Sequence, residues 1–163
     1  MFLLFYFFAF LCVRNVVLKE KFWVAACDEY LKRLRPYAKV TVAEIPDVDP
    51  ARAGGVETAL EREGAGILAA VPEGAHVILM AIEGKQRSSV DFSRHLDDLA
   101  LRGASELAFV IGGSDGVSDA VRARADETFS FGPITLPHNL ARVVLLEQLY
   151  RAFKISRGEP YHK

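Results

Sequence analysis

Two uninterrupted apolar segments limit what this chain can fold into more than any other feature. Residues 75–82 read AHVILMAI and residues 106–111 read ELAFVI. A strand with one face in water alternates apolar and polar residues, whereas a strand covered on both faces stays apolar along its length. We therefore expect both segments to be strands of a sheet that carries helices on both faces.

The rest of the chain alternates between helical and strand patterns. Within residues 19–34, Phe22, Ala26, Tyr30 and Leu34 recur at helical spacing, and Pro36 follows the helix. Further helices are expected at 58–70, from Ser88 or Ser89 to about 102, at 117–125 and at 137–155; further strands at 40–45 and 127–131; and a polar loop at 47–55. Because there is no internal repeat and no long linker, residues 1–163 are predicted to form one α/β domain with a mainly parallel sheet.

The first thirteen residues, MFLLFYFFAFLCV, are unusually apolar and have two interpretations. They could be a signal or membrane anchor, but the run is shorter than the ~20 residues that a membrane span needs. No cationic segment precedes it and no clear small-residue cleavage site follows. We therefore expect part of Met1–Val13 to form the first buried strand, which continues through Leu18 and carries an apolar extension upstream.

The overall charge balance excludes a surface that binds nucleic acid everywhere. The formal net charge is −1, so a site for a polyanion has to be a local basic patch. Hydrophobic residues make up 51% of the chain, which is typical of a globular protein.

The cysteines and histidines do not indicate a metal centre. Cys12 and Cys27 stand in apolar surroundings without a CxxC pair, so we expect buried thiols in a reducing cytoplasm. The histidines show no ligand spacing, and we expect no metal; they are His76, His95, His138 and His162.

Three loops follow the carboxyl ends of expected strands, where parallel sheets bind ligands. They come after Ile82, Ile111 and Phe131. The second, GGSDG, is neither GxGxxG nor a P-loop; it is either a ligand loop or a tight turn in which Ser114 or Asp115 caps the next helix. The third, FGPITLP, holds apolar residues in a loop, so it is either a buried crossover or one wall of a pocket suited to a purine.

The C-terminal region combines a broadly apolar helix with a basic, aromatic tail. A helix that is apolar around most of its circumference is buried on several sides, and one of those sides could face a second copy of the chain. Basic and aromatic residues interleave near the end, as in proteins that contact RNA: Arg142, Arg151, Lys154, Arg157 and Lys163 with Tyr150, Tyr161 and His162. The other interpretation is that the helix dipole stabilises these basic residues near the helix C-terminus, and that Arg151 only pairs with Glu147.

No Ser-His-Asp group, carboxylate pair or reactive cysteine is evident in the sequence. Any chemistry would then rest on a cofactor that brings its own reactivity.

Two stretches resemble one family closely. LAFVIGGSDG at 107–116 and FSFGPITLPHNLARVVLLEQLYRAFKISRGEPYHK at 129–163 resemble the bacterial SPOUT-class methyltransferases that act on a pseudouridine of 23S ribosomal RNA. Residues 18–34 are similar to that family's first helix, so the resemblance covers nearly the whole chain from about Leu18.

This resemblance implies a C-terminal trefoil knot, a homodimer formed partly through the last helix, and S-adenosyl-L-methionine bound in the knot. The reaction it implies is methylation of N3 of a pseudouridine in helix 69 of 23S rRNA, on the assembled ribosome. Motif matches imply cofactor contacts at Met80, Gly112, Phe131, Gly132, Pro133, Ile134, Thr135 and Leu136, and catalytic roles for Arg151, Tyr161 and His162. Two other classes stay open: a non-catalytic module that binds the cofactor and the ribosome, and a nucleotide-binding protein of flavodoxin type.

The chain departs from the family pattern at two places. Asn15-Val16-Val17 stands where the family has Val-Gly-Lys, and Ala81 stands where it often has Asp. The second change removes one polar neighbour of the cofactor loop, but we expect main-chain contacts to dominate binding there.

Overall fold

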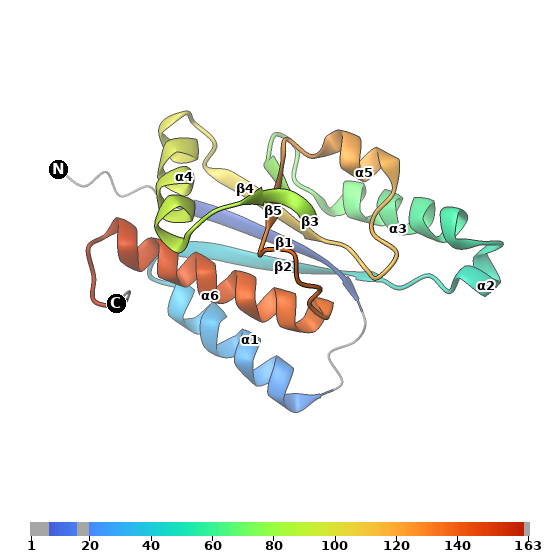
Figure 1. Cartoon of the computed structure of the whole chain (residues 1–163), viewed down its shortest axis with the longest axis horizontal. Helices are drawn as coiled ribbons and strands as arrows, with labels where there is room; N and C mark the ends of the chain where they lie inside the picture. The colour runs from blue at the N-terminus through green and yellow to red at the C-terminus, as the bar shows by residue number, and fades with distance from the viewer. Residues whose placement is uncertain (1–6, 16–19, 162–163) are drawn as a thin grey trace.

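A computed structural model of the 163-residue chain describes residues 7–15 and 20–161. Its described strands form one sheet in the order β2-β1-β4-β3-β5, and every neighbouring pair is parallel (Figure 1). The strands are β1 (Phe7–Asn15), β2 (Ala38–Pro46), β3 (His76–Gln86), β4 (Glu106–Ile111) and β5 (Glu127–Ser130). The predicted parallel α/β sheet is confirmed.

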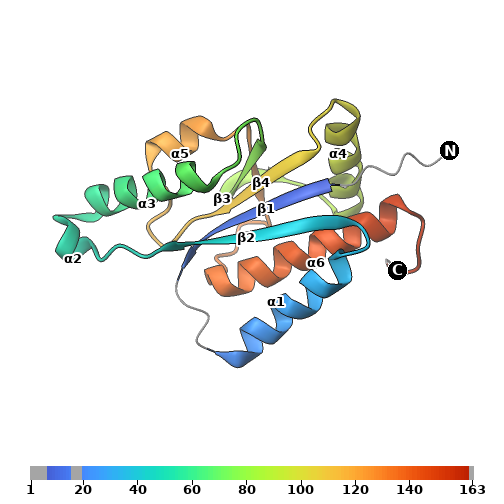
Figure 2. The ribbon, with the colours of Figure 1, turned by 180° about the vertical axis from the view of Figure 1, so that it is seen from behind.

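Helices cover both faces of this sheet, as Figures 1 and 2 show from opposite sides. The helices are α1 (Lys21–Leu34), α2 (Pro50–Ala53), α3 (Val56–Ala70), α4 (Ser89–Leu101), α5 (Asp119–Arg124) and α6 (His138–Ser156). Helices α1, α4 and α6 share one core with the sheet, while α3 and α5 pack on the opposite face. None of the helices in the described part of the chain is long and apolar enough to cross a bilayer.

The position of β4 between two helix layers explains why residues 107–111 are all apolar. Leu107, Phe109 and Ile111 enter the core that holds α1, α4 and α6. Ala108 and Val110 enter the core on the other face. Alternate residues of a strand point to opposite faces, so a strand between two helix layers needs apolar residues at every position.

The prediction that part of the apolar run forms the first strand is confirmed. Strand β1 begins within the apolar run, at Phe7, and ends at Asn15, and the predicted continuation to Leu18 lies outside the described residues. It pairs with both β2 and β4, and Leu11 and Val13 are buried. A central strand covered on both faces accounts for the apolar sequence. Val16, Val17 and residues 1–6 lie outside the described residues.

Strand β3 is longer than its apolar segment predicts. It continues to Gln86 through a bulge, because Met80 and Lys85 both pair with Phe129. A Cβ at Gly84 would lie 2.8 Å from the backbone of Phe129, so glycine lets the two strands approach at the bulge. The segment predicted as a loop is therefore partly strand.

Two helix starts also differ from expectation. The loop predicted at 47–55 contains α2, whose cap Asp49 accepts a hydrogen bond from Ala51 N at 2.9 Å, with Pro50 in the first turn. Helix α5 is capped by Ser118, which accepts a hydrogen bond from Val121 N at 3.4 Å, and not by Ser114 or Asp115. In contrast, the predicted Ser88 cap of α4 is confirmed.

Candidate functional site

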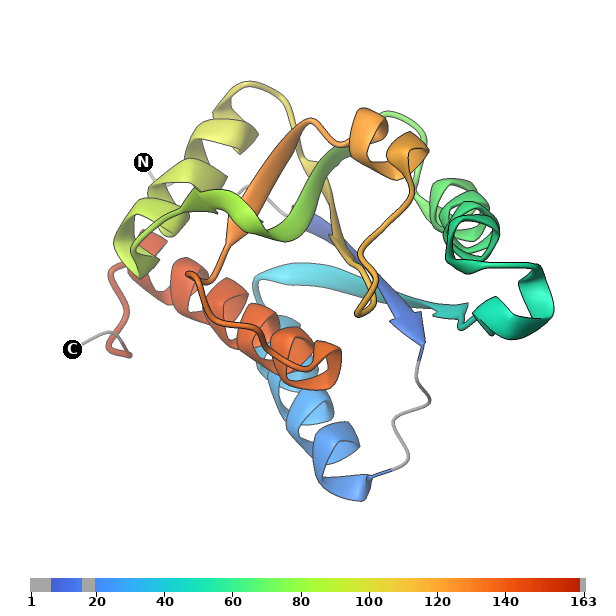
Figure 3. The ribbon, with the colours of Figure 1, turned by 45° about the vertical axis from the view of Figure 1, so that its right-hand side comes forward.

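Loops from three strands enclose one cavity of about 520 Å³ at the carboxyl edge of the sheet. Its walls come from the bulge of β3, the glycine-rich loop after β4, and the connection from β5 to the start of α6, the region that faces the viewer in Figure 3. Seven of the eight residues expected to bind the cofactor line it: Met80, Gly112, Phe131, Gly132, Ile134, Thr135 and Leu136. Pro133 is not among the lining residues.

The loop after β4 is a tight turn that brings main chain to the cavity. Gly116 N donates to Gly113 O at 3.1 Å. A Cβ at Gly112 would lie 2.7 Å from Val117 Cγ1 and 2.9 Å from Gly116 O. A side chain at residue 112 would therefore push the turn open, and glycine keeps the backbone close to the cavity.

A buried serine joins two walls of the cavity. Ser130 Oγ donates to Ile82 O at 2.8 Å and accepts from Gly132 N at 3.1 Å. Gly132 has φ 111°, a conformation that favours glycine. Because one hydroxyl holds both the β3 bulge and the Phe131–Leu136 connection, their relative position depends on Ser130. Sequence reasoning missed this residue, since a lone serine at a strand end carries no signal.

A second cluster places two of the three residues expected to be catalytic in contact. The guanidinium carbon of Arg151 lies 4.7 Å from the centre of the Tyr161 ring. Glu147 Oε1 accepts from Arg151 Nε at 2.9 Å and from the Tyr161 hydroxyl at 3.2 Å. Arg151 thus does pair with Glu147, the simpler interpretation of its sequence position, but Tyr161 joins the pair. His162 lies outside the described residues.

Tyr161 is held as a neutral phenol. Burial, a hydrogen bond with Tyr30 and the charge of Glu147 raise the pKa of Tyr161 to about 12. The hydrogen bond to Glu147 raises the pKa of Arg151 further above its usual value. At neutral pH the cluster therefore offers a fixed cation and a hydroxyl donor, and Tyr161 is unsuited to accept a proton.

The tail is clamped against the body just before Tyr161. Glu159 Oε2 accepts from the Tyr37 hydroxyl at 2.6 Å and from Lys154 Nζ at 2.5 Å. The Arg157 guanidinium lies 4.5 Å from the centre of the Tyr37 ring. The described part of the tail therefore packs on its own protomer.

The cavity and the tail cluster lie at opposite ends of α6. His138 and Ala141, in its first turn, line the cavity, whereas Arg151 lies near its last turn. Thirteen residues of helix separate His138 from Arg151, or ~20 Å at ~1.5 Å per residue. Within one protomer the structure therefore does not bring the two sets of predicted site residues together.

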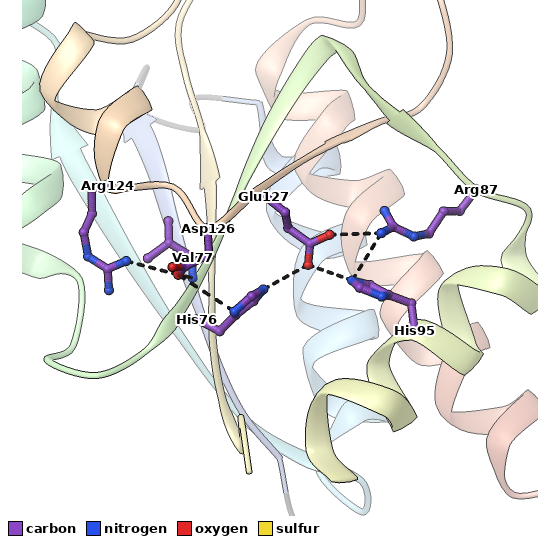
Figure 4. A network of polar contacts seen from close by, with 7 residues as sticks. All are labelled: His76, Val77, Arg87, His95, Arg124, Asp126 and Glu127. Atoms are coloured by element: carbon purple, nitrogen blue, oxygen red, sulfur yellow. Dashed lines mark hydrogen bonds and ion pairs between the residues drawn. The ribbon is translucent and has the colours of Figure 1, made fainter. Parts of the chain in front are cut away.

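A polar network that the sequence did not indicate surrounds Glu127 (Figure 4). Glu127 Oε1 accepts from Nε2 of His76 at 3.0 Å and of His95 at 2.7 Å, while Oε2 accepts from Arg87 at 3.0 Å. Burial raises the pKa of Glu127, but the hydrogen bonds from His95 and His76 and the charge of Arg87 outweigh it and hold the pKa below its usual value. The network joins β3, α4 and β5 and is structural in character. Among the described residues, no group of three or more His, Cys, Asp or Glu side chains is placed to hold a metal ion.

A parallel α/β sheet whose carboxyl-edge loops enclose a small-molecule cavity defines the class of this protein. More narrowly, the chain belongs to the SPOUT methyltransferase family: the family described as "Predicted SPOUT methyltransferase" matches residues 10–162.

Relatives over nearly the whole chain support this membership. The protein named ribosomal RNA large subunit methyltransferase H from Listeria monocytogenes serotype 4b (strain CLIP80459) is 54% identical over 149 residues, which cover 90% of this chain and 94% of the relative. The protein of the same name from Bacillus cytotoxicus is also 54% identical over 149 residues, with the same coverage.

Two solved structures share the fold. A probable methylase family protein from Haemophilus influenzae Rd KW20 superposes with a TM-score of 0.55 at 8% identity, covering 94% of this chain and 67% of its own. A putative methylase family protein from Neisseria gonorrhoeae superposes with a TM-score of 0.53 at 12% identity, covering 90% of this chain and 83% of its own.

Proposed function

We propose that this methyltransferase uses S-adenosyl-L-methionine to methylate N3 of a pseudouridine in helix 69 of 23S rRNA, on the assembled ribosome. The observation that carries the proposal is that relatives 54% identical over 90% of the chain are named ribosomal RNA large subunit methyltransferase H. The family membership also argues against the flavodoxin-type alternative.

The cavity suits a nucleoside-containing methyl donor. Its volume of about 520 Å³ lies within the ~300–1,000 Å³ typical of small-molecule sites. At the cavity walls Ile134 is 59% exposed and Ile82 is 52% exposed, so two large apolar side chains are available to pack against a ligand group such as a purine ring. Met80, Gly112 and the segment 131–136 would hold the donor, largely through main chain and apolar side chains. When bound, the donor supplies an electrophilic methyl group on its sulfonium.

The tail would act on the cavity of a second protomer. Arg151 and the cavity-lining His138 are separated by ~20 Å of helix within one chain. Leu140, Val143 and Val144 remain only half-buried on α6, which leaves apolar surface for a homodimer contact. We include in this proposal the trefoil knot, formed as the chain returns from the edge strand β5 to pack α6 against β1 and β4.

Each tail residue has a role that its chemistry supports. N3 of pseudouridine carries an imide proton that has to leave before its lone pair can attack a methyl group. Arg151, oriented by Glu147, would stabilise the imide anion as it forms. Tyr161, neutral because its pKa is raised to about 12, would exchange its hydrogen bond to Glu147 for one donated to the base. His162 would accept the proton or contact a phosphate.

One assay separates catalysis from binding alone. Ribosomes that lack the modification, and free 23S rRNA, are incubated with the protein and methyl-labelled S-adenosyl-L-methionine, and the modified base is located by mass spectrometry of RNA fragments. We expect label at N3 of one pseudouridine in helix 69, with ribosomes as the better substrate. Binding of S-adenosylhomocysteine without any transfer to either substrate would instead support a non-catalytic module.

Mixing two inactive variants tests the shared site. A variant lacking residues 161–163 keeps its cavity, and a Gly132→Val variant keeps its tail but strains the cavity wall at a residue with φ 111°. If tails act across the dimer, mixed and re-equilibrated dimers regain transfer. Two variants that stay inactive after verified exchange of protomers would contradict the composite site.

A further inference from the structure

Among the described residues that line the cavity, Glu83 is the only Asp or Glu and Arg122 is the only Lys or Arg. Arg122 Nη1 lies 2.9 Å from Glu83 Oε1. The other lining groups are apolar side chains, glycine backbone, hydroxyl groups and His138. One carboxylate and one guanidinium therefore stand side by side in an otherwise uncharged wall.

The pair connects two different walls of the cavity. Glu83 belongs to the bulge of β3, and Arg122 belongs to α5, just after the glycine-rich loop. A Cβ built on Gly116, in that loop, would lie 3.5 Å from Arg122 Nη2, so the guanidinium rests close to the loop's main chain. The two charges thus stand where the β3 bulge and the loop after β4 face each other.

Glu83 and Arg122 can readily exchange their mutual ion pair for contacts with a charged ligand. The side chains are 46% exposed for Arg122 and 64% exposed for Glu83, and ion pairs this open to water add little to stability. A hydrogen bond from its own backbone N–H and a second from Arg122 hold the pKa of Glu83 below its usual value, so the carboxylate is ionised at neutral pH. Both groups can therefore turn to a ligand of opposite charge at small cost.

We propose that Glu83 and Arg122 recognise the zwitterionic amino-acid end of the methyl donor. Glu83 binds the α-ammonium group, and Arg122 binds the α-carboxylate through its paired N–H groups. The inference rests on the proposed function, because it assumes that the cavity takes S-adenosyl-L-methionine. It adds a specificity element: the cavity selects an adenosyl ligand that carries both an ammonium and a carboxylate.

Two ligands that differ in the amino-acid end provide the test. S-adenosylhomocysteine carries the zwitterion, while 5′-methylthioadenosine has the same adenosyl group without it. Calorimetry measures both against the wild type, Arg122→Gln and Glu83→Gln, with Arg94→Gln as the control. Arg94 is an exposed helix residue that pairs with Asp91 at 3.5 Å and does not line the cavity. Circular dichroism confirms that each variant is folded.

We expect the wild type to prefer S-adenosylhomocysteine and both cavity variants to lose that preference. Each variant should bind S-adenosylhomocysteine roughly tenfold or more weakly, the usual effect of losing a charge-assisted hydrogen bond, while its affinity for 5′-methylthioadenosine changes less than about twofold. Equal weakening for both ligands, or no weakening for either, overturns the inference and leaves the proposed function standing. Tighter binding of both ligands to the variants also overturns it, because the pair would then be a latch that closes the cavity. If the wild type binds neither ligand, the proposed cofactor itself is wrong.

Discussion

Arg151 and Tyr161 lie stacked against each other, with the guanidinium carbon 4.7 Å from the centre of the tyrosine ring and Glu147 bound to both. The contact unites the last turns of α6 with the C-terminal tail. It involves no residue that lines the cavity, which lies at the other end of the helix.

Removing residues 161–163 is expected to abolish methylation and spare cofactor binding. The deletion removes the Tyr161 donor and leaves Arg151 with Glu147, and losing a group that stabilises developing charge costs roughly 100-fold or more in rate. Calorimetry with S-adenosylhomocysteine should change less than about twofold. Full methylation of ribosomes by the shortened protein would remove the tail from the mechanism.

Tyr161→Phe is a milder change that isolates the hydroxyl. The ring remains to stack on Arg151, while one hydrogen bond is lost, so we expect a rate about five- to tenfold lower. Because the pKa of Tyr161 is about 12, the wild-type rate should show no ionisation of this group between neutral pH and about pH 10. A phenol that titrates near neutral pH in the rate profile would contradict the donor role.

The Glu159 clamp should set the position of Tyr161. Glu159→Gln keeps the shape of the side chain but removes the negative charge of the carboxylate, which pairs with Lys154 and accepts a hydrogen bond from Tyr37. With the tail less firmly held, we expect kcat to fall about three- to tenfold while affinity for S-adenosylhomocysteine stays constant. Glu61→Gln, an exposed residue of α3, serves as the matched control. An unchanged kcat in Glu159→Gln would show that the clamp has no part in catalysis.

Burial patterns account for what could be predicted from the sequence. Strand β4 was predicted with the bounds observed, because its continuous apolar sequence is typical of a strand covered on both faces. Ala108 and Phe109 are indeed buried on opposite faces. The meeting of the three loops followed from the parallel sheet. Part of the apolar N-terminal run was predicted to be the first strand, but its start at Phe7 could not be predicted, because such a run resembles a targeting segment as much as a central strand.

What the sequence could not predict depends on contacts between distant residues. Glu127 meets His76 across 51 positions and His95 across 32, and no periodicity links them. The pairing of Glu83 with Arg122 likewise depends on how the β3 bulge faces α5. Arg151 and Tyr161 were named together from the family resemblance, but their contact with each other through Glu147 could not be read from the sequence.

Ser130→Ala should weaken both the fold and the cavity. The substitution leaves Ile82 O and Gly132 N without the hydroxyl that joins them, and burying polar groups that lose their partners costs ~1–3 kcal/mol. We expect a lower free energy of unfolding by that amount in chemical denaturation, and S-adenosylhomocysteine binding weaker by about fivefold or more. Ser105→Ala, at an exposed serine, is the control. Normal ligand affinity despite the lost stability would mean that the two walls hold their places without Ser130.

Glu127→Gln should change how stability depends on pH. The pKa of Glu127 is depressed in the folded protein, so its ionisation stabilises the fold above the unfolded value of ~4.3 and this contribution is lost as pH falls through the folded pKa. Above about pH 5 we expect the wild type to exceed the variant by ~1–3 kcal/mol, since His76, His95 and Arg87 lose a charged acceptor. In denaturation curves the gap should close as pH falls below ~4.3 and through the depressed folded pKa of Glu127, and Glu73→Gln, at an exposed glutamate, is the matched control. A difference that stays constant to the lowest pH would mean that the Glu127 carboxylate stabilises the network by its shape and not by its charge.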